Sequence, residues 1–408
     1  MANPFPAPVG PLGYLRIFSP TAGVKVSPLA LGTWSLGSKW SAWAGGSMTQ
    51  DEAYKYLDVY REAGGNFIDT ATMYQDGEAE MIVGDWMKTR DCRDEIVLAA
   101  KYTYCYHPEA AYSKGQLNFQ GNNAKSMYLS FESTLKRLKT DYIDIFYVHF
   151  WDYTTSIPEV MNALDALVRS RKVFYLGISD TPAWIVAKAN EYARNKGLTP
   201  FSVYQGQWSL IKRDLESEVI PMLQSEGMAL CAWGVTGSGK FKTSEELARR
   251  KTAGTFRYGM GPTAEEQSMS AALEKVGSQL PGHPAPASVA QAWSMSKVPY
   301  VFPLLGGTDP EHLKANIEAL KISLSTEQVE TLEGVKPFAP LFPQAEFGVD
   351  PALTTHGHQT SLFAMMPYIE FVRAPKPLGP PGIVRGYFGG DKPVIISGLL
   401  LNDPETHA

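Results

Sequence analysis

Four titratable residues of complementary type stand at the ends of three consecutive strand-like segments. Asp69 closes "NFID", and Tyr74 follows it in "TATMY". Lys101 closes "EIVLAAK", and His149 follows "IDIFYV". A tyrosine hydroxyl, with an ordinary pKa of about 10, becomes a better proton donor when a nearby lysine stabilises the phenolate. An aspartate can hold that lysine charged, and an imidazole can donate a hydrogen bond to a carbonyl oxygen. The set predicts a pocket in which Tyr74 exchanges a proton with an oxygen on carbon.

Each of these residues also has a purely structural interpretation. Asp69 is a common type at a turn or helix cap, Lys101 is typical of a solvated charge at a strand end, and His149 fits a core or rim histidine. The occurrence of all four types on consecutive strands favours a shared chemical role over coincidence.

The elements that must position these residues alternate regularly along the chain. From "LALGT" onward there are eight strand-like runs, and helical patterns separate them. Thr49 and Glu52 form a capping box that opens the first helix. Further helices are predicted over 77–90, 122–138, 157–170, 214–225 and 264–279, and after Thr181-Pro182 and Asp309-Pro310. This order predicts an α/β fold, a (β/α)₈ TIM barrel, with its chemistry at the carboxyl ends of the strands.

Two regions of different character divide the 408 residues. Residues 1–335 are predicted to form the barrel, with an N-terminal β-hairpin built from "YLRIF" and "VKVSP". Residues 336–408 are rich in proline, with segments such as "APKPLGPPG". We expect this C-terminal extension to be an extended tail that packs on or trails from the barrel.

Composition excludes several classes of partner. The net charge is −5, which argues against nucleic acid or an anionic membrane surface as a partner. The three cysteines lack zinc-type spacing, and His356 and His358 have no third ligand nearby, so no metal site is predicted. No signal segment or run of 18 apolar residues is found, so we expect a cytoplasmic protein. Oligomeric state is left open.

The segment "GVTGSGKF" raises the possibility of a phosphate-binding loop. Gly234, Gly239 and Lys240 have the spacing of a nucleoside-triphosphate P-loop, but Phe241 replaces the hydroxyl residue that would hold Mg²⁺. A plain flexible turn is the alternative. Because the segment follows the seventh strand at the predicted barrel mouth, we interpret it as a loop for a dinucleotide pyrophosphate.

The chain resembles the aldo-keto reductases, in particular the fungal aryl-alcohol dehydrogenases and norsolorinic acid reductase-like enzymes. The resemblance runs from about Leu15 to Val335 and rests on "FIDTATMY", "LAAKY", "YVHFWDY", "LGISDTPAW", "YQGQW", "CAWGVTGSGKF" and "GGTDPEHLKANIEAL". The family's catalytic positions fall on Asp69, Tyr74, Lys101 and His149. The resemblance implies hydride transfer between NADP(H) and a carbonyl or alcohol carbon, without a metal.

The resemblance also implies a cofactor site along the strand ends. Ser179, Asp180 and Gln205 match positions that bind the nicotinamide carboxamide, and Trp233 would stack on the nicotinamide ring. Asp180 stands where the family usually has Asn, and an ionised aspartate can only accept hydrogen bonds. The other residues expected to bind the cofactor are Thr33, Trp34, Asp69, Gly234, Val235, Gly239, Lys240, Arg257, Gly307, Thr308, His312 and Asn316.

The preference between NADPH and NADH depends on Thr308. This branch of the family usually has Arg at that position, where it pairs with the 2′-phosphate, and the next residue here is the acidic Asp309. Thr308 can still donate, and Arg257 is a candidate replacement charge. We predict NADP as the cofactor and keep NADH as the alternative.

Aromatic side chains near the predicted mouth indicate a flat, aromatic substrate. Trp34, Tyr74, His149 and Trp151 are the residues expected to contact it, with Tyr153, Trp208 and Phe119 nearby. Scattered core aromatics are the competing interpretation.

Two other functions compete with an aldo-keto reductase that acts on aromatic aldehydes, ketones or alcohols. One is a regulatory, redox-sensing barrel similar to the potassium-channel β subunits, with little turnover. The other is a P-loop protein that handles nucleoside triphosphates, which requires Ser or Thr after Lys240.

Overall fold

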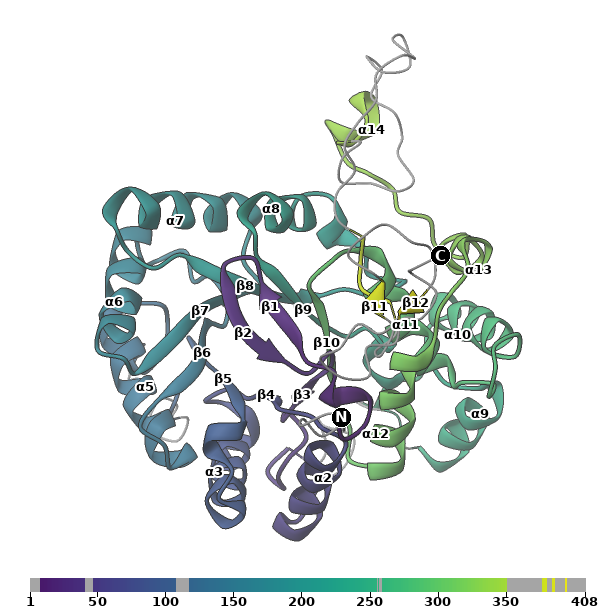
Figure 1. Ribbon diagram of the computed structural model, residues 1–408, viewed down its shortest axis with the longest axis horizontal. Helices are drawn as coiled ribbons and strands as arrows, with labels where there is room; N and C mark the ends of the chain where they lie inside the picture. Colours follow the sequence, from purple (N-terminus) through teal and green to yellow (C-terminus); the bar gives the residue numbers. More distant parts are fainter. Residues whose placement is uncertain are drawn as a thin grey trace, which may run out of the picture.

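The computed structural model describes residues 8–40, 47–107, 117–254, 256, 259–350, 376–379, 384–385 and 393–394. Eight parallel strands close into a barrel in the order β10-β3-β4-β5-β6-β7-β8-β9 (Figure 1). They are β3 Ala30–Gly32, β4 Phe67–Asp69, β5 Val97–Tyr102, β6 Ile143–Val148, β7 Val173–Ser179, β8 Phe201–Gln207, β9 Ala229–Trp233 and β10 Val301–Leu305. The predicted TIM barrel is confirmed.

Helices surround the barrel and connect successive strands (Figure 1). Those found at predicted places are α2 Gln50–Glu62, α3 Glu78–Arg90, α5 Ala124–Leu138, α6 Ile157–Arg169, α7 Ala183–Lys196, α8 Val219–Glu226, α10 Ala264–Gly277 and α12 Pro310–Ile317. The capping box of Thr49 and Glu52 is confirmed at the start of α2. The helix predicted over 214–225 is corrected, because Asp214–Glu216 forms a separate 3₁₀ turn before α8.

In the described part of the chain, four α-helices are present that the sequence patterns did not predict. They are α9 Ser244–Ala253, α11 Pro286–Lys297, α13 Thr326–Glu333 and the short α14 Gln344–Phe347. α11 packs against β10 and α10 packs against α11. Three helices, α9, α10 and α11, therefore follow one another in the chain between β9 and β10.

The predicted N-terminal hairpin is confirmed as β1 Arg16–Ser19 and β2 Ala22–Val26, which pair antiparallel. It crosses one end of the barrel in Figure 1. Phe18 packs against the rings of Phe67 and Phe302, with centroid distances of 5.4 and 5.3 Å. These residues belong to a buried cluster inside the barrel. The hairpin thus closes the end of the barrel opposite the carboxyl ends of its strands.

Beyond the barrel, the described part of the C-terminal extension touches it at a few points. Lys336 pairs with Glu265 at 2.9 Å, and Gln344 Nε2 donates to the carbonyl oxygen of Ser217 at 3.1 Å. The short strands β11 Val384–Arg385 and β12 Pro393–Val394 pair with each other. The division into residues 1–335 and 336–408 stays a prediction.

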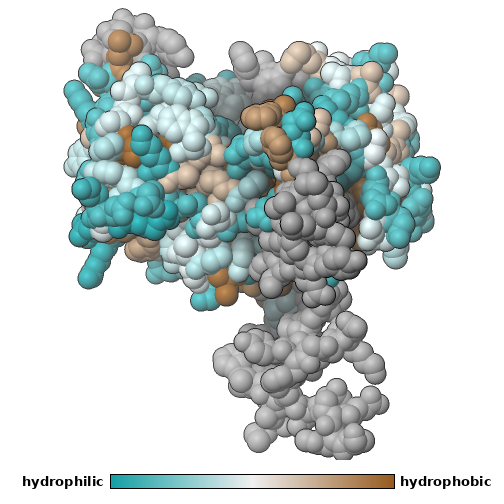
Figure 2. Space-filling model, turned by 90° about the horizontal axis from the view of Figure 1, so that it is seen from above, coloured by the Kyte–Doolittle hydropathy of each residue, from teal (hydrophilic) through white to brown (hydrophobic). Residues whose placement is uncertain are grey.

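Within the described residues, no helix is long and apolar enough to cross a bilayer. On the face shown in Figure 2, hydrophobic residues form small separate patches among hydrophilic ones.

Candidate active site

A buried ion pair lies at the carboxyl ends of two neighbouring strands. Asp69 ends β4, and Lys101 is the penultimate residue of β5. Lys101 Nζ donates to Asp69 Oδ1 and to the carbonyl oxygen of Thr70, the latter at 2.9 Å. Gln205 Nε2 donates to the second carboxylate oxygen of Asp69 at 2.9 Å. The two charged side chains are 0% and 1% exposed, so they interact in a poorly screened environment.

Tyr74 lies beside this pair in a short 3₁₀ turn, Tyr74–Gly77, that follows β4. Lys101 Nζ is 5.2 Å from the centroid of the Tyr74 ring. Tyr74 is 8% exposed, so its ring is covered although it belongs to the mouth of the barrel. A fixed ammonium at this distance stabilises the negative charge that develops when a tyrosine gives up its proton.

His149 completes the cluster from the end of β6. Its backbone N–H donates to Tyr102 O and to Thr103 Oγ1, both at 3.2 Å, which holds the residue against β5. Its ring centroid lies 6.0 Å from that of Tyr74. Burial, and then the charge of Lys101, lower the pKa of His149 well below its ordinary value. Its Nδ1 atom has no hydrogen-bond partner within the described structure, so a neutral imidazole is available to a ligand.

The residues expected to bind a carboxamide lie together on β7 and β8, where Ser179 and Gln205 are register partners. Asp180 has a left-handed backbone with φ of 40°, a conformation that Asn and Asp tolerate better than most residues. Trp233 Nε1 donates to Asp180 Oδ1 at 3.4 Å. Although Asp180 keeps contact with solvent, partial burial raises its pKa to about 6. Ser179 is buried, and Trp233 is partly buried.

The glycine loop after β9 forms a small concave site. Gly234, Gly237 and Gly239 have φ values of 75°, 64° and 85°, which only glycine adopts freely. A cavity of about 170 Å³ is lined by this loop together with Gln207, the last residue of β8, and Ser209 just after it. Lys240 lines it too, but its Nζ pairs with Glu266 at 3.1 Å. Val235 is buried in the main core cluster.

Apart from the buried pair of Asp69 and Lys101, a group of charged side chains lies where α9 approaches the start of α12. Lys242 and Arg250 both pair with Glu246, at 3.4 and 2.9 Å. His312 Nδ1 lies 3.5 Å from Asp309 Oδ2, and the charges of Lys242, Glu246 and Arg250 all act on its ring. Burial, followed by Lys242, lowers the pKa of His312.

This group stands beside the other residues expected at the adenosine end. Ser35 Oγ donates to the carbonyl oxygen of Gly307 at 2.6 Å, which joins the loop after β3 to the loop after β10. Thr308 and Asn316 are partly buried. Arg257 lies outside the described residues, so Lys242 and Arg250 are the basic side chains that the structure describes close to His312.

The aromatic wall differs from the expected set. Trp34 contacts Tyr74 edge to face at 5.2 Å and Trp40 at 4.8 Å. Tyr104 contacts the ring of His149 at 4.9 Å. Trp40 and Tyr104 were missed because their loops show no regular pattern, although Trp40 lies six residues after Trp34 and Tyr104 three residues after Lys101. The described wall therefore centres on the loops after β3 and β5.

Two tryptophans expected near the mouth are buried, and the substrate contact expected of Trp151 stays a prediction. Trp151 is 8% exposed and is part of the main core cluster. Trp208 is fully buried against Trp293, at a ring distance of 4.9 Å, and its indole N–H donates to Glu216. A tryptophan can fill either a core or a mouth, so its type alone does not separate these places.

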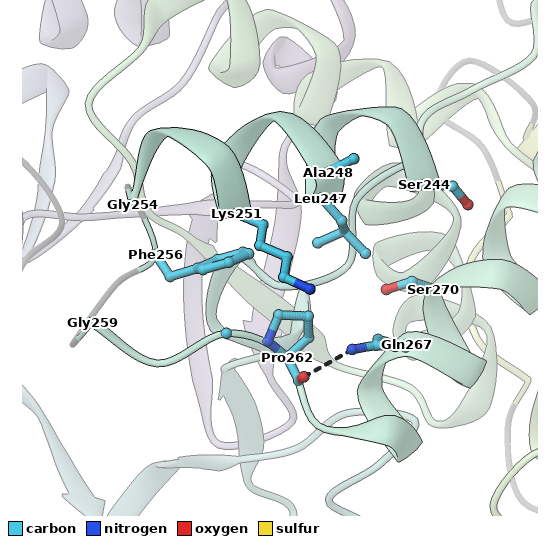
Figure 3. Close-up of a pocket in the computed structure, with 11 residues that line it drawn as sticks. Ser244, Leu247, Ala248, Lys251, Gly254, Phe256, Gly259, Pro262, Gln267 and Ser270 are labelled. Atoms are coloured by element: carbon cyan, nitrogen blue, oxygen red, sulfur yellow. Dashed lines mark hydrogen bonds between the residues drawn. The ribbon is translucent and has the colours of Figure 1, made fainter.

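A larger cavity, of about 670 Å³, lies between α9 and α10 (Figure 3). None of Asp69, Tyr74, Lys101 and His149 lines it. Lys251 extends into it, beside Phe256 and Leu247. Its Gln267 donates to Pro262 O, and its Ser270 donates to Lys240 O, so both polar groups already have protein partners. Because no cluster of titratable side chains lines it, we place the chemistry at the barrel mouth. Within the described ranges, no group of three or more His, Cys, Asp or Glu side chains could hold a metal ion.

The sequence of this chain is similar to those of known oxidoreductases. A sequence model of the aldo/keto reductase family matches residues 28–337. Norsolorinic acid reductase A of Aspergillus parasiticus is 49% identical over 83% of this chain and 85% of its own. A putative aryl-alcohol dehydrogenase of Saccharomyces cerevisiae is 47% identical over 86% and 94%. An aryl-alcohol dehydrogenase [NADP(+)] of Phanerodontia chrysosporium is 46% identical over 85% and 91%.

Proposed function

This chain belongs to the aldo/keto reductase family, and we propose that it interconverts aryl aldehydes or ketones and their alcohols with NADP(H). Tyr74 is the general acid/base of this reaction. The observation that carries the proposal is the placement of the Tyr74 ring 5.2 Å from the ammonium of Lys101, which is itself buried and paired with Asp69. Two similar fungal proteins are named for aryl alcohols, which supports the substrate class.

Each residue of the cluster has a separate task in this reaction. NADPH, when bound, supplies the hydride to the carbonyl carbon. Tyr74 donates its hydroxyl proton to the carbonyl oxygen, and Lys101 stabilises the resulting phenolate. Asp69 keeps the ammonium of Lys101 aimed, and the neutral His149 donates a hydrogen bond to the same oxygen. In the oxidative direction Tyr74 takes the proton back.

The residues at the mouth fit a nicotinamide dinucleotide. Among the described residues, Thr33 Oγ1 and His149 Nδ1 are buried polar atoms without a protein partner, as expected where a ligand supplies one. The nicotinamide carboxamide would be held by Ser179, Asp180 and Gln205. Trp233 would stack on the nicotinamide ring. The positive-φ glycines after β9 would let the backbone approach the pyrophosphate. Lys240 would then break its ion pair with Glu266 and neutralise the negative charge of the pyrophosphate.

The choice of NADP over NAD rests on two basic residues that pair with Glu246, Lys242 just before α9 and Arg250 on it. Lys242 and Arg250 would take the role of the missing Arg at Thr308 and pair with the 2′-phosphate. Asp309 favours the opposite choice, since an acidic residue pairs with the free 2′-hydroxyl of NAD. One of the similar dehydrogenases is named for NADP(+), and this favours NADP.

One assay tests this proposal. The purified protein is titrated with NADPH and with NADH by fluorescence, and veratraldehyde is then added while the absorbance of the reduced cofactor is followed. We expect NADPH to bind more tightly and to be oxidised. Tyr74→Phe should lower kcat by roughly 10²–10⁴-fold and leave the Kd of NADPH within about twofold.

The outcomes against the proposal are distinct. Cofactor binding without oxidation over a broad panel of aryl aldehydes and ketones would favour a regulatory barrel. Full activity of Tyr74→Phe would remove Tyr74 as the proton donor. If NADH bound more tightly than NADPH, only one part of the proposal would be overturned, the assignment of Lys242 and Arg250 to the 2′-phosphate. A cytoplasmic location stays a prediction.

A further inference from the structure

Gln75, the residue after the proposed general acid, is completely buried and has a left-handed backbone with φ of 53°. Its side chain does not act within the turn that contains it. Gln75 Nε2 donates to the carbonyl oxygen of Trp34 at 2.8 Å, and Gln75 Oε1 accepts from the backbone N–H of Trp40 at 2.7 Å. One amide therefore holds both ends of the segment 34–40, which follows β3.

Neighbouring residues bind the same segment at further points. Trp40 Nε1 donates to Asp76 Oδ1 at 3.0 Å. The backbone N–H of Ser38 donates to Glu78 Oε2 at 2.7 Å. Gly37 has φ of 136°, and a Cβ there would lie 2.7 Å from Glu78 Oε2 and 3.0 Å from Gln75 Cβ, so the two segments are in close contact. We call residues 34–40 the tryptophan loop.

The tryptophan loop carries one part of the aromatic wall described above. The Trp34 ring meets Tyr74 at 5.2 Å and Trp40 at 4.8 Å, both edge to face. Tyr74, Gln75 and Asp76 are consecutive, so the proton donor and the anchors of the two indoles are joined by a few covalent bonds. A change at Gln75 would alter the position of both indoles relative to the Tyr74 hydroxyl.

From these contacts we propose that Gln75 is a positioning residue that sets the selectivity of the site for flat aromatic substrates, by fixing Trp34 and Trp40 relative to Tyr74. The inference rests on the proposed function and adds a determinant of its substrate class. Glutamine suits this place because it donates and accepts at once, whereas glutamate offers acceptors only when ionised. A carboxylate at 75 would face the carbonyl oxygen of Trp34 and leave it without its donor.

The test compares Gln75→Glu and Gln75→Asn with a matched control, Gln279→Glu, at an exposed glutamine two residues after the end of α10. Gln75→Asn keeps the amide and tolerates a left-handed φ, but it is too short to bind both ends of the loop. Kinetics are measured with veratraldehyde and with hexanal, and the Kd of NADPH is measured in parallel. We expect about a tenfold rise in KM for veratraldehyde, a change below about threefold in kcat, and an unchanged Kd. Values for hexanal and for Gln279→Glu should stay within about twofold of the parent.

Equal losses with both aldehydes, or no change with either, would overturn the proposal. A second readout does not depend on activity. In protein labelled with 5-fluorotryptophan, the resonances of Trp34 and Trp40, assigned with Trp34→Phe and Trp40→Phe, should shift and broaden in both Gln75 variants. If the parent does not reduce veratraldehyde, the proposed function fails, and the fluorine spectra still decide whether Gln75 orders the two indoles. Unaltered resonances would refute that role.

Discussion

The two ends of the site are built on opposite plans. At the catalytic end, Lys101 already contacts Asp69, Gln205 contacts the same carboxylate, and the turn after Tyr74 is bonded to the tryptophan loop. At the dinucleotide end, the basic residues are paired with acidic neighbours that a cofactor would have to replace, as with Lys240 and Glu266. The loop after β9 also contains three glycines, Gly234, Gly237 and Gly239, which have no side chains to hold it in place.

This difference separates chemistry from binding. Groups that stabilise a developing charge work best when they are aimed before the reaction begins, since no energy is then spent on reorganising them. Groups that hold a cofactor must also release it, and an exchange of ion pairs keeps the net gain small. We therefore expect changes at the catalytic end to affect stability and kcat, and changes at the dinucleotide end to affect Kd.

The largest effect should come from breaking the buried pair. Lys101→Met leaves the carboxylate of Asp69 buried without its counterion, which we expect to lower the free energy of unfolding by about 3–5 kcal/mol. Urea denaturation measures this loss. Lys321→Met, which breaks an exposed pair with Glu318, is the control and should leave the midpoint unchanged.

A double variant sharpens this result. Asp69→Asn combined with Lys101→Met removes both charges, so most of the lost stability should return while activity stays absent. If the double variant is no more stable than Lys101→Met, the loss arises from packing and the buried charge is not its cause.

An intermediate effect is expected from Glu266→Gln, which releases Lys240 toward the pyrophosphate. Gln keeps the capping box with Thr263 at the start of α10, so the helix should be preserved. We expect the Kd of NADPH and of NADH to fall by about threefold to tenfold alike, because both share the pyrophosphate. Lys240→Met should raise both Kd values and make them depend less on salt concentration. Weaker binding by Glu266→Gln would place Lys240 outside the cofactor site.

The smallest effect is a pH dependence from Asp180, whose pKa is raised to about 6 by burial. The folded protein therefore keeps this proton at a pH where the unfolded chain has released it, so Asp180's contribution to stability grows as the pH falls from 7 toward 5. Binding of NAD⁺ should change in the opposite sense, because its cationic ring favours the ionised carboxylate. We expect affinity about twofold to threefold weaker at pH 5 than at pH 7.

Asp180→Asn is the control for this titration, since it keeps His149, Lys101 and the left-handed backbone. Its affinity for NAD⁺ should not vary over the same range. NAD⁺ is chosen because it lacks the 2′-phosphate, which itself titrates near pH 6. An equal slope in Asp180→Asn would assign the pH dependence to another group.

Most of the barrel could be predicted because its strands and helices have distinct periods. The exceptions have physical reasons. α9, "SEELARRKTA", has no fully buried residue and hence no apolar face to reveal it. α11 has the opposite property, because ten of its residues from Pro286 to Met295 are buried and small residues fill most of its surface, so it shows no polar face. Both lack the contrast on which periodicity depends.

The candidate site divides in the same way. Asp69, Lys101 and His149 could be predicted to meet because parallel strands bring their carboxyl ends to one edge. The bonds from Gln75 to Trp34 and Trp40 could not, since they join loops about 40 residues apart through a left-handed turn. Likewise, the sequence shows the charge of Lys240 but not its partner Glu266, which lies 26 residues away on another helix.

The closure of the barrel has a consequence for its synthesis. β3 is completed by pairing with β10, and Ser35 and Gly307, which bond across the same seam, stand 272 positions apart in the chain. On the ribosome, β3 waits with one open edge until nearly the whole barrel has emerged. The loops after β3 and β10 meet only at that seam, so the pocket for the adenosine end is completed at the last step of folding.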